Sequence, residues 1–256
     1  NAGGNASNDS DDAALLSRGR LLADVPSPTW MELHTAADGS QVLYAVLEDT
    51  NEKRHFASGG AGDSLRLVEL SRVPTPGHAA THVVFVCDDE GQGRLITADY
   101  ADGYVCVHPV TESGVILEVA QMLRGEGHGP LPKPDQAASL AFVPWNALQG
   151  EAGAAAASEG MAGLAYVGLR GSERIVTLLW DGKRLTRLDE PDVPGWRGRG
   201  IDCAGSRPRH LLAIGNLLLA ANEASNNVAI FRLSADGEPN LAATLPSGAP
   251  TVFVRL

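Results

Sequence analysis

Four polar side chains occupy the same place in four strand-like stretches of this 256-residue sequence. Glu48, Tyr100, Arg170 and Glu223 each follow a short apolar run, and the residue two positions earlier is small in every case. A carboxylate can act as a general base on a water molecule, and an arginine can hold a carboxylate or phosphate group. These residue types therefore predict hydrolysis of an anionic substrate, provided that the fold brings the strand ends together.

Further candidates lie near the C-terminus and in one Gly- and Pro-rich stretch. In RPRHLLAI, Arg209 and His210 open a first strand and are expected to approach the central channel, where the Pro-Arg entry fixes the backbone and the arginine presents donors suited to carboxylate or phosphate. RGEGHGPLP places a histidine in a loop that can reach over a cavity. We predict Glu48, His128 and Arg170 as catalytic residues, and Tyr100, Arg209, His210, Asn222 and Glu223 as substrate-binding residues. The alternative is that each is a solvated polar residue at a strand end or in a loop.

Other familiar chemistry has no motif in this sequence. It contains no GxSxG, no Ser-His-Asp order, no phosphate-binding loop and no zinc-ligand spacing. We therefore expect neither a metal nor a cofactor.

A repeating unit of strands must position these candidates. Apolar and alternating stretches recur in the same order, and the second stretch of each unit begins near Leu43, Leu95, Leu164 and Leu218. Units of four strands that recur in this way, here with about 50–70 residues between the leucines of successive units, are typical of β-propeller blades. A β-sandwich is the alternative, but it would not repeat the same polar strand end four times. The sequence therefore predicts an all-β propeller of four-stranded blades.

The two ends of the chain predict how the propeller closes. APTVFVRL, from Ala249, matches the first strand of a blade, and ALLSRGRLLADV near the start resembles outer strands. Pairing the N- and C-terminal strands in one blade would leave no edge exposed. We expect about five blades in a single domain, residues 1–256. Within it, residues 1–14 are expected to be flexible and residues 149–163 to form a mobile insertion loop.

The composition of the chain limits the classes of molecule that it is expected to bind. The formal net charge of -11 argues against nucleic acid and anionic membrane as partners. No apolar run approaches the length of a membrane span and no signal peptide is visible, so we expect a cytoplasmic protein. An anionic substrate would need a local basic pocket, which is the role that the arginines predict.

Several of these units together resemble one known family. The Arg-Gly of YVGLRG and the PRHLLAI, LLLAAN and NNVAIF series are similar to the lactonases with seven-bladed β-propellers. That family includes bacterial 6-phosphogluconolactonase of the propeller type and the carboxymuconate lactonising enzymes. Its members carry about two more blades, whereas here GHGPLPKPDQAAS runs directly into the next unit. Either this protein lacks those blades, or a segment near residues 130–137 is missing from the sequence.

The resemblance implies hydrolysis of a sugar lactone, most specifically 6-phosphogluconolactone, a step of the pentose phosphate pathway. On this chain it implies Glu48 or His128 as the base and Arg170 and Arg209 as anion-binding residues. The alternatives are a muconate-type lactonising enzyme and a non-catalytic propeller that binds a sugar, peptide or protein at its central cavity. The oligomeric state is left open.

Overall fold

The computed structural model describes most of the chain, in seven stretches. They are residues 20–36, 38–59, 66–87, 90–124, 135–149, 161–188 and 200–255. His128, residues 1–14 and most of the expected insertion loop lie outside the described residues, so the predictions made for them remain predictions.

The described chain forms four antiparallel sheets, which we call blades 1 to 4. Blade 1 contains β1 (Pro28–Thr35), β2 (Gln41–Leu47), β3 (Glu52–Gly59) and β4 (Arg66–Pro74). Blade 2 contains β5 (Ala80–Cys87), β6 (Gly93–Asp99), β7 (Tyr104–Pro109) and β8 (Gln121–Arg124). Blade 3 contains β9 (Ala137–Pro144), β10 (Gly163–Leu169), β11 (Arg174–Trp180), β12 (Leu185–Arg187) and the short β13 (Ile201–Asp202). Blade 4 contains β14 (Pro208–Ile214), β15 (Leu217–Asn222), β16 (Asn227–Leu233) and β17 (Pro239–Pro246).

The prediction of an all-β propeller is confirmed. The second strand of each blade begins within two residues of the predicted leucine. A single helical turn, α1 (Trp145–Gln149), is the one helix among the described residues, and it is too short to cross a membrane. Within each blade every strand pairs with the next along the chain, as is usual for antiparallel neighbours, except that the short β13 pairs with β11.

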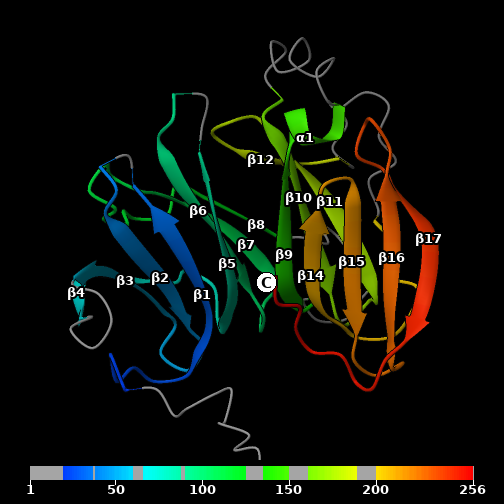
Figure 1. Cartoon of the computed structure of the whole chain (residues 1–256), viewed down its shortest axis with the longest axis horizontal. Coiled ribbons are helices and arrows are strands. Elements are labelled where there is room, and N and C mark those ends of the chain that lie inside the picture. The colour runs from blue at the N-terminus through cyan, green and yellow to red at the C-terminus, as the bar shows by residue number, and fades with distance from the viewer. Residues whose placement is uncertain are drawn as a thin grey trace, which may run out of the picture.

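The first strand of each blade lies toward the middle of the molecule, and we call these four the inner strands. Strand β5 packs against both β1 and β9, and β9 packs against β14, whereas β4 and β17 lie at the two outer sides (Figure 1). Apolar side chains fill the spaces between successive blades. Burial of both faces of the middle blades explains why strands such as β10 are apolar at nearly every position.

The expected fifth blade is not seen in the described residues. Residues 249–255 carry no strand, and the side chains of Val252 and Val254 are 51% and 73% exposed. A single segment without a hydrogen-bonded neighbour does not form a strand, because its backbone groups have no partners. Residues 1–19 lie outside the described part, so closure of the ring by the two ends is not confirmed. The structure describes four blades where we predicted about five.

Candidate functional site

Each inner strand carries a β-bulge near its first residue, where it pairs with the second strand of its own blade. The extra residues are Thr29 in β1, Thr81 in β5, Ala138 in β9 and Arg209 in β14. A bulge turns the extra residue out of the regular alternation of side chains. All four of these residues line a single cavity of about 350 Å³. The repeated bulge is therefore the feature of the fold that builds the cavity wall.

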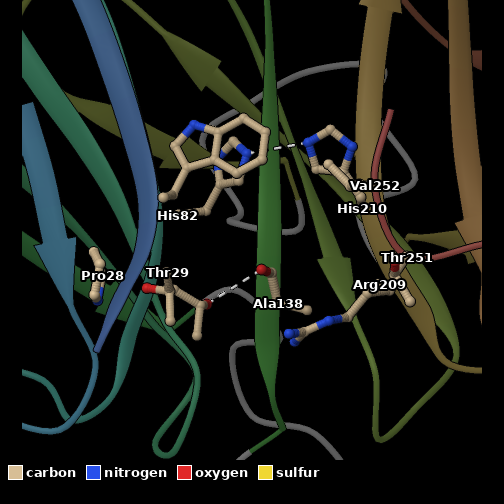
Figure 2. A pocket seen from close by; sticks show the side chains of 10 residues that line it. Pro28, Thr29, His82, Ala138, Arg209, His210, Thr251 and Val252 are labelled. Atoms are coloured by element: carbon tan, nitrogen blue, oxygen red, sulfur yellow. Dashed lines mark hydrogen bonds between the residues drawn. The ribbon is translucent and has the colours of Figure 1, made fainter. Parts of the chain in front are cut away.

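The rest of the cavity wall comes from residues next to the bulges and from the end of the chain. They are Pro28, Trp30, His82, His210, Thr251 and Val252 (Figure 2). Arg209 is the one charged residue among the described residues of this wall. It makes no ion pair with any described residue, although it is only partly exposed. A guanidinium in this position is available to an anionic ligand.

Hydroxyl groups join neighbouring inner strands around the cavity. Thr29 Oγ1 donates to the carbonyl oxygen of Ala80 at 2.9 Å, and Thr81 Oγ1 donates to that of Ala138 at 3.2 Å. These hydroxyl protons are used within the protein, so the threonine oxygens face the cavity mainly as acceptors. They suit a ligand that carries hydroxyl groups.

The four residues that the sequence placed in register are structurally equivalent. Each donates its backbone N–H to the carbonyl of the residue that precedes the inner strand of its own blade. The pairs are Glu48 to Ser27 at 3.2 Å, Tyr100 to Ala79 at 2.8 Å, Arg170 to Gln136 at 2.9 Å and Glu223 to Arg207 at 3.2 Å. The bulged residues also lie at this end of the inner strands, so these four residues lie at the same end of the blades as the cavity.

Three of these four side chains meet. Arg170 Nη2 lies 2.6 Å from Oε2 of Glu223, and the Arg170 guanidinium carbon lies 5.9 Å from the centre of the Tyr100 ring. The cluster joins blades 2, 3 and 4. Glu48 makes no side-chain contact of this kind with the described residues. The structure thus brings Tyr100, Arg170 and Glu223 together and leaves Glu48 apart.

The remaining predicted residues divide between the cavity and its surroundings. Arg209 and His210 line the cavity. Asn222 is buried beneath a loop, where its Nδ2 donates to the Cys203 carbonyl at 3.0 Å. That contact anchors the loop, and it gives no support to the substrate-binding role that we predicted for Asn222. The catalytic roles of Glu48 and His128 remain predictions.

A pair of buried imidazoles forms part of the cavity wall. His82 Nε2 lies 3.3 Å from His210 Nε2, and Trp30 stacks on His82 with 4.2 Å between ring centres. Burial holds the pKa of His82 well below its ordinary value, with a smaller contribution from His210. Burial, followed by the charge of Arg209, lowers the pKa of His210 to about 4. Both rings are therefore neutral at physiological pH.

Sequence analysis missed eight of the ten cavity residues, five of which carry a polar or aromatic side chain: Thr29, Trp30, Thr81, His82 and Thr251. A signal for them exists in the sequence. SPTW, AATH, QAAS and RPRH each carry the bulged residue at their third position, and their last two residues supply seven of the ten residues of the wall. APTV, from Ala249, continues the pattern at the end of the chain.

The side chains that most often bind metal ions are not clustered in the described part of the chain. No group of three or more His, Cys, Asp or Glu side chains there is arranged to hold a metal ion. The polar groups that converge on the cavity are a guanidinium, two neutral imidazoles and threonine oxygens, a set suited to an oxygen-rich organic anion.

The fold and the cavity define a β-propeller with a polar site between its inner strands. Residues 5–147 match the model of the family described as lactonase, 7-bladed beta-propeller, and the chain belongs to that family. A comparison with curated proteins gives no match.

Solved structures show the same fold. A proposed 6-phosphogluconolactonase from Bacteroides uniformis has a TM-score of 0.57 at 20% identity, over 88% of this chain and 58% of its own. One from Bacteroides fragilis has a TM-score of 0.59 at 21% identity, over 88% and 59%. A proposed exo-β-1,3-galactanase from Bifidobacterium bifidum has a TM-score of 0.52 at 9% identity, over 86% and 72%. The chain thus spans less than two thirds of the two Bacteroides proteins.

Proposed function

We propose that this protein hydrolyses an anionic sugar lactone, most specifically 6-phosphogluconolactone, in the cavity between its inner strands. The observation that carries this proposal is the Arg209 guanidinium, which lines the cavity without an ion pair to any described residue. The chain carries a formal net charge of -11, so a cation that pairs with no carboxylate of the described residues is a specific feature of this site. Membership of the lactonase family and the activity proposed for the Bacteroides proteins support the same substrate class.

The cavity groups suit the recognition of such a substrate. Arg209 would bind the phosphate through charge-assisted hydrogen bonds. Thr29 and Thr81, whose protons are already donated to neighbouring carbonyls, would accept hydrogen bonds from sugar hydroxyls. The ring of Trp30 offers an apolar surface beside them.

Opening the lactone requires attack by water on the ester carbonyl and stabilisation of the oxyanion that forms. Donors fixed in a site that excludes water are effective at the second task. Glu48 or His128 is the proposed base that accepts the proton of the attacking water. The ring oxygen then leaves the carbonyl carbon and takes up a proton, which yields the open-chain acid.

The two arginines differ in their proposed roles. Arg170 is already paired with Glu223, so its charge is largely balanced within the protein. We therefore assign the anion to Arg209 and assign Arg170, with Tyr100 and Glu223, to holding blades 2, 3 and 4 together at the rim of the site.

A direct test compares hydrolysis of 6-phosphogluconolactone with that of gluconolactone, in the parent and in Arg209→Gln. We expect the parent to prefer the phosphorylated substrate and the variant to lose that preference by roughly thirty-fold, as for loss of a charge-assisted hydrogen bond. Arg207→Gln, at an exposed arginine two positions earlier, is the matched control. Equal rates for both substrates in the parent would reject the phosphate site. A parent that binds these sugars without hydrolysing them would favour a non-catalytic propeller.

A further inference from the structure

The imidazole pair in the cavity wall is held at its far side by the end of the chain. The backbone N–H of Phe253 donates to Nδ1 of His210 at 3.1 Å, and Nε2 of His210 faces Nε2 of His82. His82 comes from β5 and His210 from β14, so the contact spans the cavity (Figure 2). The ring of Trp30, from β1, lies 4.2 Å from the ring of His82 and 4.7 Å from that of His210, between ring centres. Three blades and the chain end thus converge on two imidazoles.

The hydrogen bonds determine which nitrogen carries each proton. A backbone N–H can only donate, so Nδ1 of His210 is the acceptor and bears no proton. The neutral ring of His210 then carries its proton on Nε2, which donates to Nε2 of His82. His82 must in turn carry its proton on Nδ1, because its Nε2 is accepting.

This chain of donors ends at a buried group without a partner. Nδ1 of His82 is buried and has no hydrogen-bond partner among the described residues, and the side chain is only 3% exposed. A buried donor that lacks an acceptor is unfavourable. The carbonyl or oxyanion oxygen of a ligand is the kind of acceptor that would satisfy it.

We propose that the backbone N–H of Phe253 is a positioning group that fixes the tautomers of His82 and His210. Held in this way, the pair has no free basic nitrogen, and its one donor without a partner among the described residues, Nδ1 of His82, is buried and becomes available to a ligand only when the ring moves. The role of the pair in lactone hydrolysis rests on the proposed function: a neutral imidazole donates to the oxygen that becomes negative, and the general base lies elsewhere. The tautomers themselves do not depend on that function.

The path of the last described residues explains how the backbone of Phe253 comes to lie beside His210. Ala249 N donates to Oδ1 of Asn226 at 3.0 Å, just as Ala79 N, at the entry of β5, donates to Oδ1 of Asn51 at 2.8 Å. The segment therefore enters the cavity along the path of an inner strand. Thr251 and Val252 then form part of the wall, and Phe253 follows at His210.

The primary test needs no change to the pair. Long-range ¹H–¹⁵N correlation spectra of the parent distinguish protonated from unprotonated imidazole nitrogens, with His82→Gln and His210→Gln used for assignment. We expect His210 protonated at Nε2 and His82 protonated at Nδ1. The reverse pattern, or a proton on Nδ1 of His210, would overturn the proposal.

A matched pair of variants tests the donor itself. Phe253→Pro removes the N–H, whereas Phe253→Leu keeps it and removes only the ring. We expect the proline variant to show a mixture of His210 tautomers and the leucine variant to keep the parent's pattern. Unchanged tautomers in a folded proline variant would overturn the proposal, and if that variant fails to fold, the parent spectrum still decides.

Kinetics separate this inference from the proposed function. If the lactone is hydrolysed, His82→Gln should lower kcat more than it changes KM and should keep the shape of the pH profile. Loss of the low-pH limb of kcat/KM in His82→Gln would identify the pair as the base and overturn the inference. A parent with the expected tautomers but no hydrolysis would reject the lactonase proposal alone.

Discussion

Arg170 and Glu223 form an ion pair of 2.6 Å between blades 3 and 4, and their side chains are 13% and 35% exposed. Arg209, which lies on the same blade as Glu223, has no such partner among the described residues. The two arginines that sequence analysis placed in one role therefore have different electrostatic surroundings. One is balanced within the protein, and the other is available to a ligand.

This difference predicts unequal effects of removing each arginine. Arg209→Ala should weaken binding of 6-phosphogluconate by about 2 kcal/mol, the usual cost of a charge-assisted hydrogen bond. Arg170→Ala should change the binding free energy by less than about 1 kcal/mol. Titration calorimetry of both variants and the parent provides the measurement. Equal losses would restore the original prediction that both arginines bind the anion.

The bulge hydroxyls should contribute to stability. Thr29→Val and Thr81→Val each remove a hydrogen bond between neighbouring inner strands and should each lower the free energy of unfolding by about 1 kcal/mol. Thr35→Val, at an exposed position at the end of β1, is the control and should have little effect. Urea denaturation measures all three. A loss at Thr35 as large as at the bulges would contradict the assignment.

Asp99 predicts a pH dependence of stability. Its buried carboxyl accepts from Cys106 Sγ at 3.2 Å and faces Lys53 across the contact between blades 1 and 2. Burial raises the pKa of Asp99 to about 6, and the nearby Lys53 opposes this rise. Between about pH 4 and pH 6 the folded state thus binds more protons than the unfolded state, so this group makes the protein less stable as the pH rises.

Asp99→Asn should remove that titration. Relative to the parent, the variant should therefore become more stable by about 2–3 kcal/mol of unfolding free energy when the pH is raised from 4 to 7. The size follows because one pKa unit corresponds to about 1.4 kcal/mol. Urea denaturation at unit steps of pH checks this, with the exposed Asp24→Asn as control. A constant difference across that range would show that Asp99 is ionised in the folded protein throughout.

Alanine substitutions at two glycines distinguish the stability cost of a strained backbone from the cost of steric crowding. Gly39 and Gly237 have nearly the same positive φ, 83° and 82°, but a Cβ at Gly39 would meet nothing, whereas one at Gly237 would collide with Leu164. Gly237 also accepts a hydrogen bond from the hydroxyl of the buried Tyr166 at 2.7 Å. Gly39→Ala should cost about 1 kcal/mol and Gly237→Ala about 3 kcal/mol or more. Thermal unfolding of the two variants compares them, and similar losses would contradict the crowding at Gly237.

The sequence by itself determined the strands and the blade as a unit. Alternation of apolar residues and the short polar turns between strands are local features, and they set hairpin pairing directly. For the same reason the equivalence of Glu48, Tyr100, Arg170 and Glu223 could be predicted: each ends the second strand of its blade.

Only the tertiary structure decided what the cavity contains. Trp30, His82 and His210 lie far apart in the sequence and meet because a bulge at the start of each inner strand turns its side chains toward the centre. The bulge falls at the very start of each inner strand and shifts the alternation of only the first side chains, so the periodicity of the strand as a whole does not reveal it. The pairing of Arg170 with Glu223, and the contact of Phe253 with His210, likewise depend on how whole blades and the chain end pack together. Packing between blades is set by distant parts of the chain, and this is why the residues of the site were predicted less completely than the strands that carry them.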